Sequence, residues 1–463
     1  MNQENKMGTQ PVASLLLTMA IPMVISMLVQ ALYNVVDSMF VAQISENALT
    51  AVSLAYPWQT LMIGVAVGTG VGCNAMISRW LGAGQTNLVK SGAEHALVLA
   101  LLSAVVFAIA GTALSHVFFT AQTNVAEIVQ YGDDYMKIIS MFCFGLFFSC
   151  ITEKLLSSTG RTTLTMVTQA SGALTNIILD PIMIFGYFGF PAMGVTGAAI
   201  ATVIGQTVGA LLGIWLNLRW NKELPISFKG FKWNSNVVGQ IYSVGIPSII
   251  MQCIGSVMTY LMNILLTTFS TTATAVFGVY FKLQSFAFMP VFGLNNSLGP
   301  IAAYNYGARK PRRILDVFKA GVCYATTFMV IGFVLFTFFP EQLLSLFKPS
   351  EQMLQIGVPA LRIISISFLM AGFDIQCSSL FQSLGHGVLS MWSSIIRQLV
   401  ALIPLAWLLS LSGNLELVWL AFPLAEVVTV LLNSVFLVRI IRRQIRPLEV
   451  ERELEPALEE AGL

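Results

Sequence analysis

The stretch AIPMVISMLVQALYNVVDSMFV, residues 20–41, is long and apolar enough to cross a lipid bilayer as one helix. About 20 consecutive apolar residues in helical form span the hydrocarbon core of a membrane. Polar side chains nevertheless interrupt this stretch, among them Gln30, Tyr33, Asn34 and Asp37. A carboxylate costs several kcal/mol in such surroundings unless it faces protein or water. The stretch therefore predicts a membrane-spanning helix with a functional polar face.

The composition of the whole chain indicates the same class of protein. Hydrophobic residues make up 56% of the 463 residues, and charged residues make up only 10%. A typical soluble domain is about a quarter charged. We therefore expect an all-α integral membrane protein with roughly twelve transmembrane helices. The expected spans are residues 12–42, 50–77, 92–119, 131–157, 162–187, 192–218, 236–268, 272–301, 317–340, 354–382, 388–411 and 415–441.

The distribution of basic residues predicts the orientation of these spans. Lys and Arg concentrate in the loops on one side, including the runs at 309–313 and 439–446, whereas the opposite side receives only Lys137 and Lys348. Short loops rich in Lys and Arg stay in the cytoplasm. We therefore expect a multi-pass protein of the cytoplasmic membrane with both termini in the cytoplasm. The short basic loops favour contact with membrane lipid over nucleic acid.

An internal repeat relates the two halves of the chain. Three anchors recur at an offset of 225 residues, and they pair Pro22 with Pro247, Gly82 with Gly307, and Gly160 with Gly385. Three matches at one offset indicate a duplicated unit. The chain is therefore expected to form two pseudo-symmetric six-helix lobes. Transporters built from such repeats hold their substrate in a cavity between the repeats.

The repeat also predicts the domain boundaries. The expected parts are an N-terminal lobe, a cytoplasmic linker, a C-terminal lobe and a charged cytoplasmic tail, at residues 1–218, 219–235, 236–445 and 446–463.

The membrane acids do not follow the repeat. At the same offset Asp37 corresponds to Met262, Asp180 to Leu405, and Asp374 to Ser149. Groups that hold up a duplicated scaffold should recur in both halves, whereas groups that do not recur are candidates for function. Sequence drift is the alternative explanation.

Polar residues form stripes on two of the expected helices. Gln30, Tyr33, Asn34 and Asp37 are spaced i, i+3, i+4, i+7, which places them on one face. A second stripe consists of Gln169, Gly172, Asn176 and Asp180. Such a face must lie against protein or water. We expect Gln30, Tyr33, Asn34 and Gln169 to line a cavity.

Asp37, Asn176, Asp180 and Thr202 together offer two carboxylates, a carboxamide and a hydroxyl. Hard cations such as Na⁺ prefer oxygen ligands, and the same carboxylates are equally suited to hold a proton. A purely structural role in hydrogen bonding between helices is the alternative, chiefly for Asn176 and Thr202.

Other ionisable residues lie within the expected spans. Asp374 predicts a second acidic site in the tenth span. The sequence leaves open the roles of Glu94, Glu153, Lys282, Arg397 and Glu426. No HExxH, GxSxG or P-loop pattern is present, so the sequence predicts neither catalytic residues nor an organic cofactor.

Four stretches carry a resemblance to a known family. In order along the chain they are residues 20–41, GAGQ at 82–85, LTNIILDPIMIFG at 174–186 and GVTGAAIAT at 194–202. Their order and spacing resemble the MATE (multidrug and toxic compound extrusion) transporters, and within them the MepA-like bacterial branch. The resemblance covers nearly the whole chain.

The resemblance implies an antiporter that exports lipophilic, often cationic compounds in exchange for inward Na⁺ or H⁺. It implies a cation site in the N-terminal lobe at Asp37, Asn176, Asp180 and Thr202. In the NorM-type branch a tenth-helix aspartate belongs to a C-lobe cation site, which Asp374, followed by Gln376, matches. That branch also uses a seventh-helix glutamate, and the corresponding stretch GIPSIIMQCIGSVM contains no acid.

The expected mechanism is alternating access by two lobes, with hinges at Pro22 and Pro247. We expect a monomer that binds small lipophilic or cationic molecules and uses no cofactor besides the coupling ion. Three alternatives stay open from the sequence: a lipid-linked oligosaccharide flippase of the same superfamily, a polytopic membrane enzyme and a passive channel.

Overall fold

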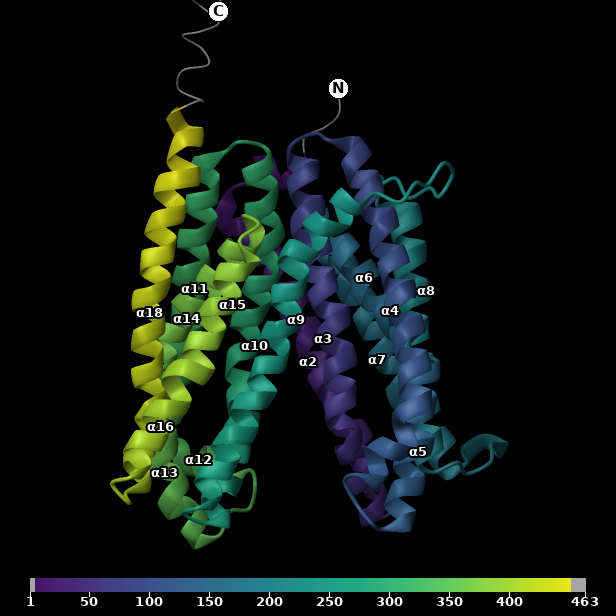
Figure 1. Cartoon of the computed structure of the whole chain (residues 1–463), viewed down its shortest axis with the longest axis vertical. Coiled ribbons are helices and arrows are strands. Elements are labelled where there is room, and N and C mark those ends of the chain that lie inside the picture. The colour runs from purple at the N-terminus through teal and green to yellow at the C-terminus, as the bar shows by residue number, and fades with distance from the viewer. Residues whose placement is uncertain (1–4, 451–463) are drawn as a thin grey trace, which may run out of the picture. The chain divides into compact units, whose positions relative to one another are not determined.

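The computed structural model describes residues 5–450, and this part of the chain consists of helices joined by short loops, with no strand (Figure 1). A helix satisfies its own backbone hydrogen bonds, which lipid cannot do. The predicted all-α class is confirmed. The last part of the predicted tail, residues 451–463, lies outside the described residues.

The helices of the first half are α1 (Lys6–Thr9), α2 (Val12–Ala42), α3 (Glu46–Gly82), α4 (Thr86–Thr120), α5 (Ala126–Met141), α6 (Phe144–Ser158), α7 (Thr162–Phe185), the short η1 (Tyr187–Gly189) and α8 (Val195–Trp220). Those of the second half are α9 (Ser235–Thr267), α10 (Thr271–Gly307), α11 (Pro311–Phe338), α12 (Pro340–Ser345), α13 (Glu351–Ser365), α14 (Phe368–Ser383), α15 (Gly387–Ile395), η2 (Ile396–Leu402), α16 (Ile403–Ser410), α17 (Leu415–Trp419), α18 (Ala421–Ile440) and η3 (Ile441–Ile445).

Each of the predicted spans has a helix or a bent helix pair at its place. Within residues 5–450, nine helices are long and apolar enough to cross a membrane, and two bent pairs raise this number to eleven. The pairs α5–α6 and α13–α14 bend by 47° and 51°. The remaining predicted span is α7, in which the polar stripe lowers the mean hydropathy. The helix that hydropathy marks least clearly is therefore the one that carries Asn176 and Asp180.

The repeat is visible in the backbone. Gly160 and Gly385 both have left-handed backbone conformations, with φ of 81° and 87°. Gly84 and its counterpart Arg309 share this conformation, with φ of 69° and 51°. Residues with a side chain rarely adopt this region. Loops at equivalent places in the two halves thus turn in the same way.

The chain packs as two compact units. Among the described residues, one unit contains residues 25–81 and 85–249, and the other contains 5–24, 82–84 and 250–450. Each unit holds most of one predicted lobe, and α2 and α9 each begin in one unit and continue into the other. The changeover follows Val24 in α2 and Ile249 in α9, two residues after Pro22 and Pro247.

The unit around residues 25–249 has a continuous hydrophobic core drawn from α3, α4, α5, α6 and α8 and the start of α9. Within it α7 packs on α8, and α6 packs on both. In the other unit α10, α11, α14 and α18 run side by side (Figure 1). There α1 is fixed to the end of α10, because the Asn305 side chain donates to the Met7 carbonyl at 2.9 Å.

Replacing Gly160 or Gly385 by alanine should destabilise the fold. Both glycines have a positive φ, and a Cβ in this conformation costs about 1–2 kcal/mol. We expect a lower melting temperature for Gly160→Ala and Gly385→Ala in detergent. Gly239→Ala is the matched control, because Gly239 lies in α9 with no atom within 4 Å of an added Cβ. Unchanged melting of both test variants would contradict the proposed role of the left-handed turns.

Candidate functional site

Close packing of α7 on α8 positions the candidate cation site. A Cβ added to Gly172 would lie 2.8 Å from the Gly205 carbonyl oxygen, and one added to Gly205 would lie 3.0 Å from Cβ of Asn176. Because neither glycine has a side chain, the two helices approach backbone to backbone. Thr202 lies three residues before Gly205 on α8. The approach therefore brings Asn176 against Thr202.

Asn176, Asp180 and Thr202 form one buried hydrogen-bonded group. Asp180 is fully buried, and Asn176 and Thr202 are 2% and 8% exposed. In the amide orientation that satisfies its neighbours, Nδ2 of Asn176 donates to Oδ2 of Asp180 at 3.0 Å. Its Oδ1 then accepts from the Thr202 backbone N–H at 3.1 Å and from the hydroxyl at 3.3 Å. Asn176 thus links the two helices at the level of Asp180.

Asp37 of α2 joins this group. Its carboxyl lies within hydrogen-bonding reach of the Asp180 carboxyl, and its buried Oδ1 has no hydrogen-bond partner among the described residues. Neither acid forms an ion pair with a basic side chain in residues 5–450. Two ionised carboxylates in contact repel each other strongly in low dielectric. A cation or a proton between the two carboxyl groups would remove this repulsion.

The predicted site residues Asp37, Asn176, Asp180 and Thr202 are thus brought together, with oxygens from three helices. This donor set fits a small hard cation. No group of three or more His, Cys, Asp or Glu side chains suited to a metal ion occurs in the described part of the chain. The carboxylates, amide and hydroxyl of this group are hereafter called the Asp37–Asp180 cluster.

Two tyrosines and a glutamine extend the Asp37–Asp180 cluster. Tyr33 and Tyr135 both interact electrostatically with Asp37 and Asp180. Tyr135 of α5 is 3% exposed, and its hydroxyl accepts a hydrogen bond from Gln59 of α3 at 2.8 Å. Tyr33 was expected on the polar face. The sequence did not single out Tyr135 or Gln59, because neither belongs to a polar stripe and only packing brings them to the acids.

The other residues of the expected polar face make no contact with the Asp37–Asp180 cluster among the described hydrogen bonds. Gln30 and Asn34 are exposed. Gln169 instead donates to Oε2 of Glu153 at 2.7 Å, and Ser149 donates to Oε1 of Glu153 at 3.1 Å. Gln169 therefore hydrogen-bonds to a separate buried acid, Glu153 on α6. On α7, Gln169 and Asn176 thus hydrogen-bond to different acids.

A second acidic group lies in the other unit. Asp374 of α14 is 2% exposed, and its Oδ1 accepts from the Asn433 side chain at 2.7 Å. Its carboxyl also reaches Glu426 of α18, and Glu426 lies 3.6 Å from the Arg397 guanidinium. Asp374 and Glu426, which come from the separate helices α14 and α18, thus lie together beside the guanidinium of Arg397. We call this group the Asp374–Glu426 cluster.

Gln376 lies apart from the Asp374–Glu426 cluster. It is fully buried against Gly321 of α11, and neither atom of its amide has a hydrogen-bond partner in the described residues. Lys282 also takes no part, because its Nζ lies 5.9 Å from the centre of the Phe347 ring. No hydrogen bond therefore joins Gln376 to Asp374 in the described residues.

A family model described as MatE matches residues 22–182 and 247–408, and so the chain belongs to the MatE family. The two matched segments begin at Pro22 and Pro247, which are the first anchors of the internal repeat.

Known proteins similar to this chain carry transporter names. The probable multidrug resistance protein NorM of Thermotoga maritima is 27% identical over 399 residues, covering 85% of each chain. The multidrug export protein MepA of Staphylococcus aureus is 24% identical over 411 residues, which are 88% of this chain and 90% of MepA. A solved multidrug resistance MATE family transporter of the MOP superfamily, in an outward-facing conformation, has the same fold. It is 24% identical and gives a TM-score of 0.89 over 97% of this chain and 99% of its own.

The family and the spans define the class of this protein. It is a multi-pass protein of the plasma membrane and a secondary transporter rather than an enzyme. The resemblance expected from the sequence is confirmed.

The contact between Asp37 and Asp180 predicts that cations stabilise the protein. Na⁺ or protons should raise the melting temperature of the purified protein, because binding to the folded state adds about 2.7 kcal/mol at 100 times Kd. In Asp180→Asn this gain should be largely lost, because one carboxylate remains. Glu416→Gln removes an exposed acid and should keep the gain. Equal shifts in Asp180→Asn and the wild type would contradict cation binding between the two acids.

Arg397 should stabilise the Asp374–Glu426 cluster by offsetting its charge. Loss of one partner of a fully buried ion pair costs about 3–5 kcal/mol. The Arg397 side chain is 29% exposed, so we expect about 2 kcal/mol for Arg397→Gln. The double variant Arg397→Gln, Glu426→Gln should regain most of this loss in thermal unfolding. A double variant no more stable than the single one would contradict the pairing.

Proposed function

We propose that this protein is an antiporter that exports lipophilic, cationic small molecules across the bacterial cytoplasmic membrane in exchange for inward Na⁺ or H⁺. The observation that carries this proposal is the contact of Asp37, on the membrane-spanning helix α2, with Asp180 on α7, without a basic partner. Intramembrane acids of this kind mark ion or proton pathways. The names of the NorM and MepA relatives support multidrug export.

The coupling ion is proposed to bind at the Asp37–Asp180 cluster. Either Na⁺ or a proton offsets the repulsion between the two carboxylates, and Asn176 and Thr202 supply further oxygens for Na⁺. Occupation by the ion removes negative charge that would attract a cationic substrate. Substrate and ion should therefore each weaken the binding of the other, by the same factor.

The hinges are proposed at Pro22 and Pro247. Proline removes a backbone hydrogen bond within a helix and favours a bend. Both α2 and α9 change from one packing unit to the other two residues past the proline. A bend at either proline would therefore lie close to the residue at which its helix leaves one unit for the other. Asp37 lies on α2 beyond Pro22, so ion binding and bending involve the same helix.

The remaining expectations are part of the proposal. The protein works as a monomer with both termini in the cytoplasm, and the coupling ion is the only cofactor. The flippase alternative needs cationic side chains for a pyrophosphate group. The Asp37–Asp180 cluster has no basic member, and the Asp374–Glu426 cluster has two acids for the single guanidinium of Arg397. This balance of charge favours export of cations.

The test is efflux of a cationic dye from vesicles that contain the purified protein, with Na⁺ and pH gradients imposed separately. One of the two gradients should drive efflux by the wild type. Asp37→Asn and Asp180→Asn should lower this efflux at least about 100-fold, because the loss of a charged ion ligand costs about 3 kcal/mol.

Asp316→Asn is the control, because Asp316 is an exposed acid of α11 and its variant should transport normally. Gradient-driven efflux at the wild-type rate by both cluster variants would refute the proposal. Efflux down the dye gradient alone, without response to either ion gradient, would instead identify a passive channel.

A further inference from the structure

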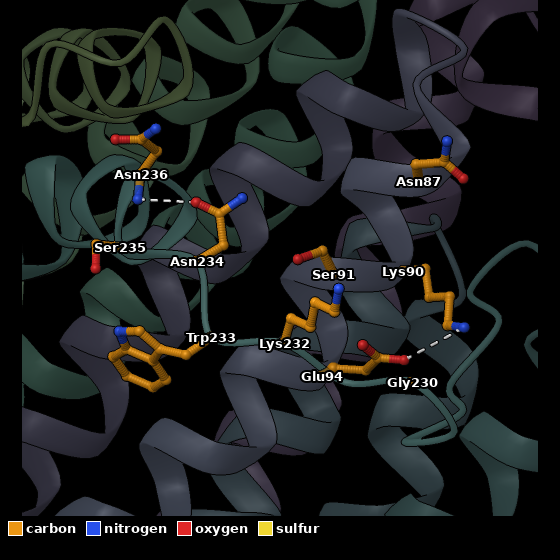
Figure 2. A pocket seen from close by; sticks show the side chains of 10 residues that line it. All are labelled: Asn87, Lys90, Ser91, Glu94, Gly230, Lys232, Trp233, Asn234, Ser235 and Asn236. Atoms are coloured by element: carbon orange, nitrogen blue, oxygen red, sulfur yellow. Dashed lines mark hydrogen bonds and ion pairs between the residues drawn. The ribbon is translucent and has the colours of Figure 1, made fainter.

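A polar pocket of about 460 Å³ lies where α4 and α9 begin, beside the end of the linker that joins α8 to α9 (Figure 2). All of its lining residues belong to the unit of residues 25–249. Those that carry the following argument are Lys90, Ser91, Glu94, Lys232, Ser235 and Asn236.

A buried histidine fixes the wall of this pocket. His95 is fully buried, and its Nε2 accepts a hydrogen bond from the Asn234 backbone N–H at 2.9 Å. Its Nδ1 lies 2.7 Å from the Ser91 carbonyl oxygen, so the ring carries its proton there. The rings of Phe231 and Trp233 pack against the imidazole at 5.0 and 5.4 Å. The end of the linker is thus held on α4, and the pocket is a built feature.

The pocket presents charges of both signs. Nζ of Lys90 lies 3.7 Å from Oε1 of Glu94. Glu94 is 5% exposed, and this oxygen has no hydrogen-bond partner among the described residues. Lys232 forms neither a hydrogen bond nor an ion pair in residues 5–450. Figure 2 shows the side chains of Lys90, Glu94 and Lys232 at the pocket. A buried acceptor, Glu94, and an available cation, Lys232, therefore line the same pocket.

The starts of two helices strengthen the attraction for an anion. α4 begins at Thr86 and α9 begins at Ser235, and helix N-termini present backbone N–H groups and partial positive charge. The Asn234 side chain already caps Asn236 at 3.0 Å, whereas Gln85 makes no side-chain hydrogen bond at the start of α4. The lysines and the start of α4 thus favour a phosphate group.

The position of the pocket along the spans fits the lipid headgroup region. α4 and α9 are both candidate membrane-spanning helices, and the pocket lies at their N-terminal ends, along residues 87–94 of α4 and the first two residues of α9. Trp233, which lines the pocket, is 51% exposed, and Trp220 at the end of α8 and Phe228 in the linker are 55% and 51% exposed. Exposed Trp side chains of this kind gather at the membrane–water interface.

We propose that this pocket binds the headgroup of an aminophospholipid, a phosphodiester that carries a primary amine. The phosphate lies against Lys232, Lys90 and the start of α4, and the ammonium group donates hydrogen bonds to Glu94. The pocket is separate from the Asp37–Asp180 cluster, and lipid binding there does not depend on the proposed transport function.

The presence of both positive and negative side chains in the pocket predicts an order of affinity among lipids. Phosphatidylcholine carries the same phosphate but has no N–H to donate, and phosphatidylglycerol carries no amine. Phosphatidylethanolamine is therefore expected to bind best. A site that recognised negative charge alone would prefer phosphatidylglycerol.

The test is native mass spectrometry of the full-length protein in detergent, titrated with each of the three lipids. Lys232→Gln should weaken binding of phosphatidylethanolamine about fivefold, because a basic residue near a lipid surface contributes about that factor. Glu94→Gln should abolish the preference for phosphatidylethanolamine over phosphatidylcholine and keep the phosphate contact. Lys229→Gln is the control, because Lys229 is an exposed linker lysine outside the pocket lining.

Three results would overturn the proposal: tighter binding of phosphatidylglycerol, equal effects of Lys232→Gln and Lys229→Gln, or displacement of the lipid by inorganic phosphate alone. The last would assign the pocket to free phosphate. Lys232 is exposed, so its variant should fold even if Glu94→Gln does not. Binding is read without transport, so failure here leaves the antiporter proposal untouched.

Discussion

The contact between the carboxyls of Asp37 and Asp180 is the constraint on which the candidate site depends. Charge in a membrane must be offset by a partner, and no basic side chain of the described residues forms an ion pair with either acid. The surrounding structure holds the two acids in place. Glycines let α7 approach α8, and Asn176 ties Asp180 to Thr202. A site held this firmly and left short of positive charge is suited to take up and release a cation.

The duplicated scaffold makes the asymmetry of the site informative. Equivalent glycines turn the backbone in both halves, and both halves contain a bent helix pair. The position equivalent to Asp37 is nevertheless Met262, which is fully buried. The second unit has its own acids, but Arg397 lies beside them. The two halves thus share a frame and differ in charge balance, which is why ion coupling is assigned to the Asp37–Asp180 cluster.

Much of this architecture could be predicted from the sequence, because hydropathy and helical spacing act locally. The spans, the repeat and the grouping of Asp37 with Asn176, Asp180 and Thr202 follow from these patterns. The partner of Asp374 could not be predicted, because Glu426 and Arg397 come from helices whose packing order no local pattern records. The hydrogen bond from the Gln169 amide to Glu153 on α6 could not be predicted for the same reason.

The most direct measurement is the affinity of the purified protein for a cationic dye, with and without the coupling cation. The account predicts that Na⁺ or protons weaken dye binding to the wild type and leave binding to Asp37→Asn unchanged, because the two ligands oppose each other through this acid. Dye affinity in the wild type that responds to neither Na⁺ nor pH would contradict the account.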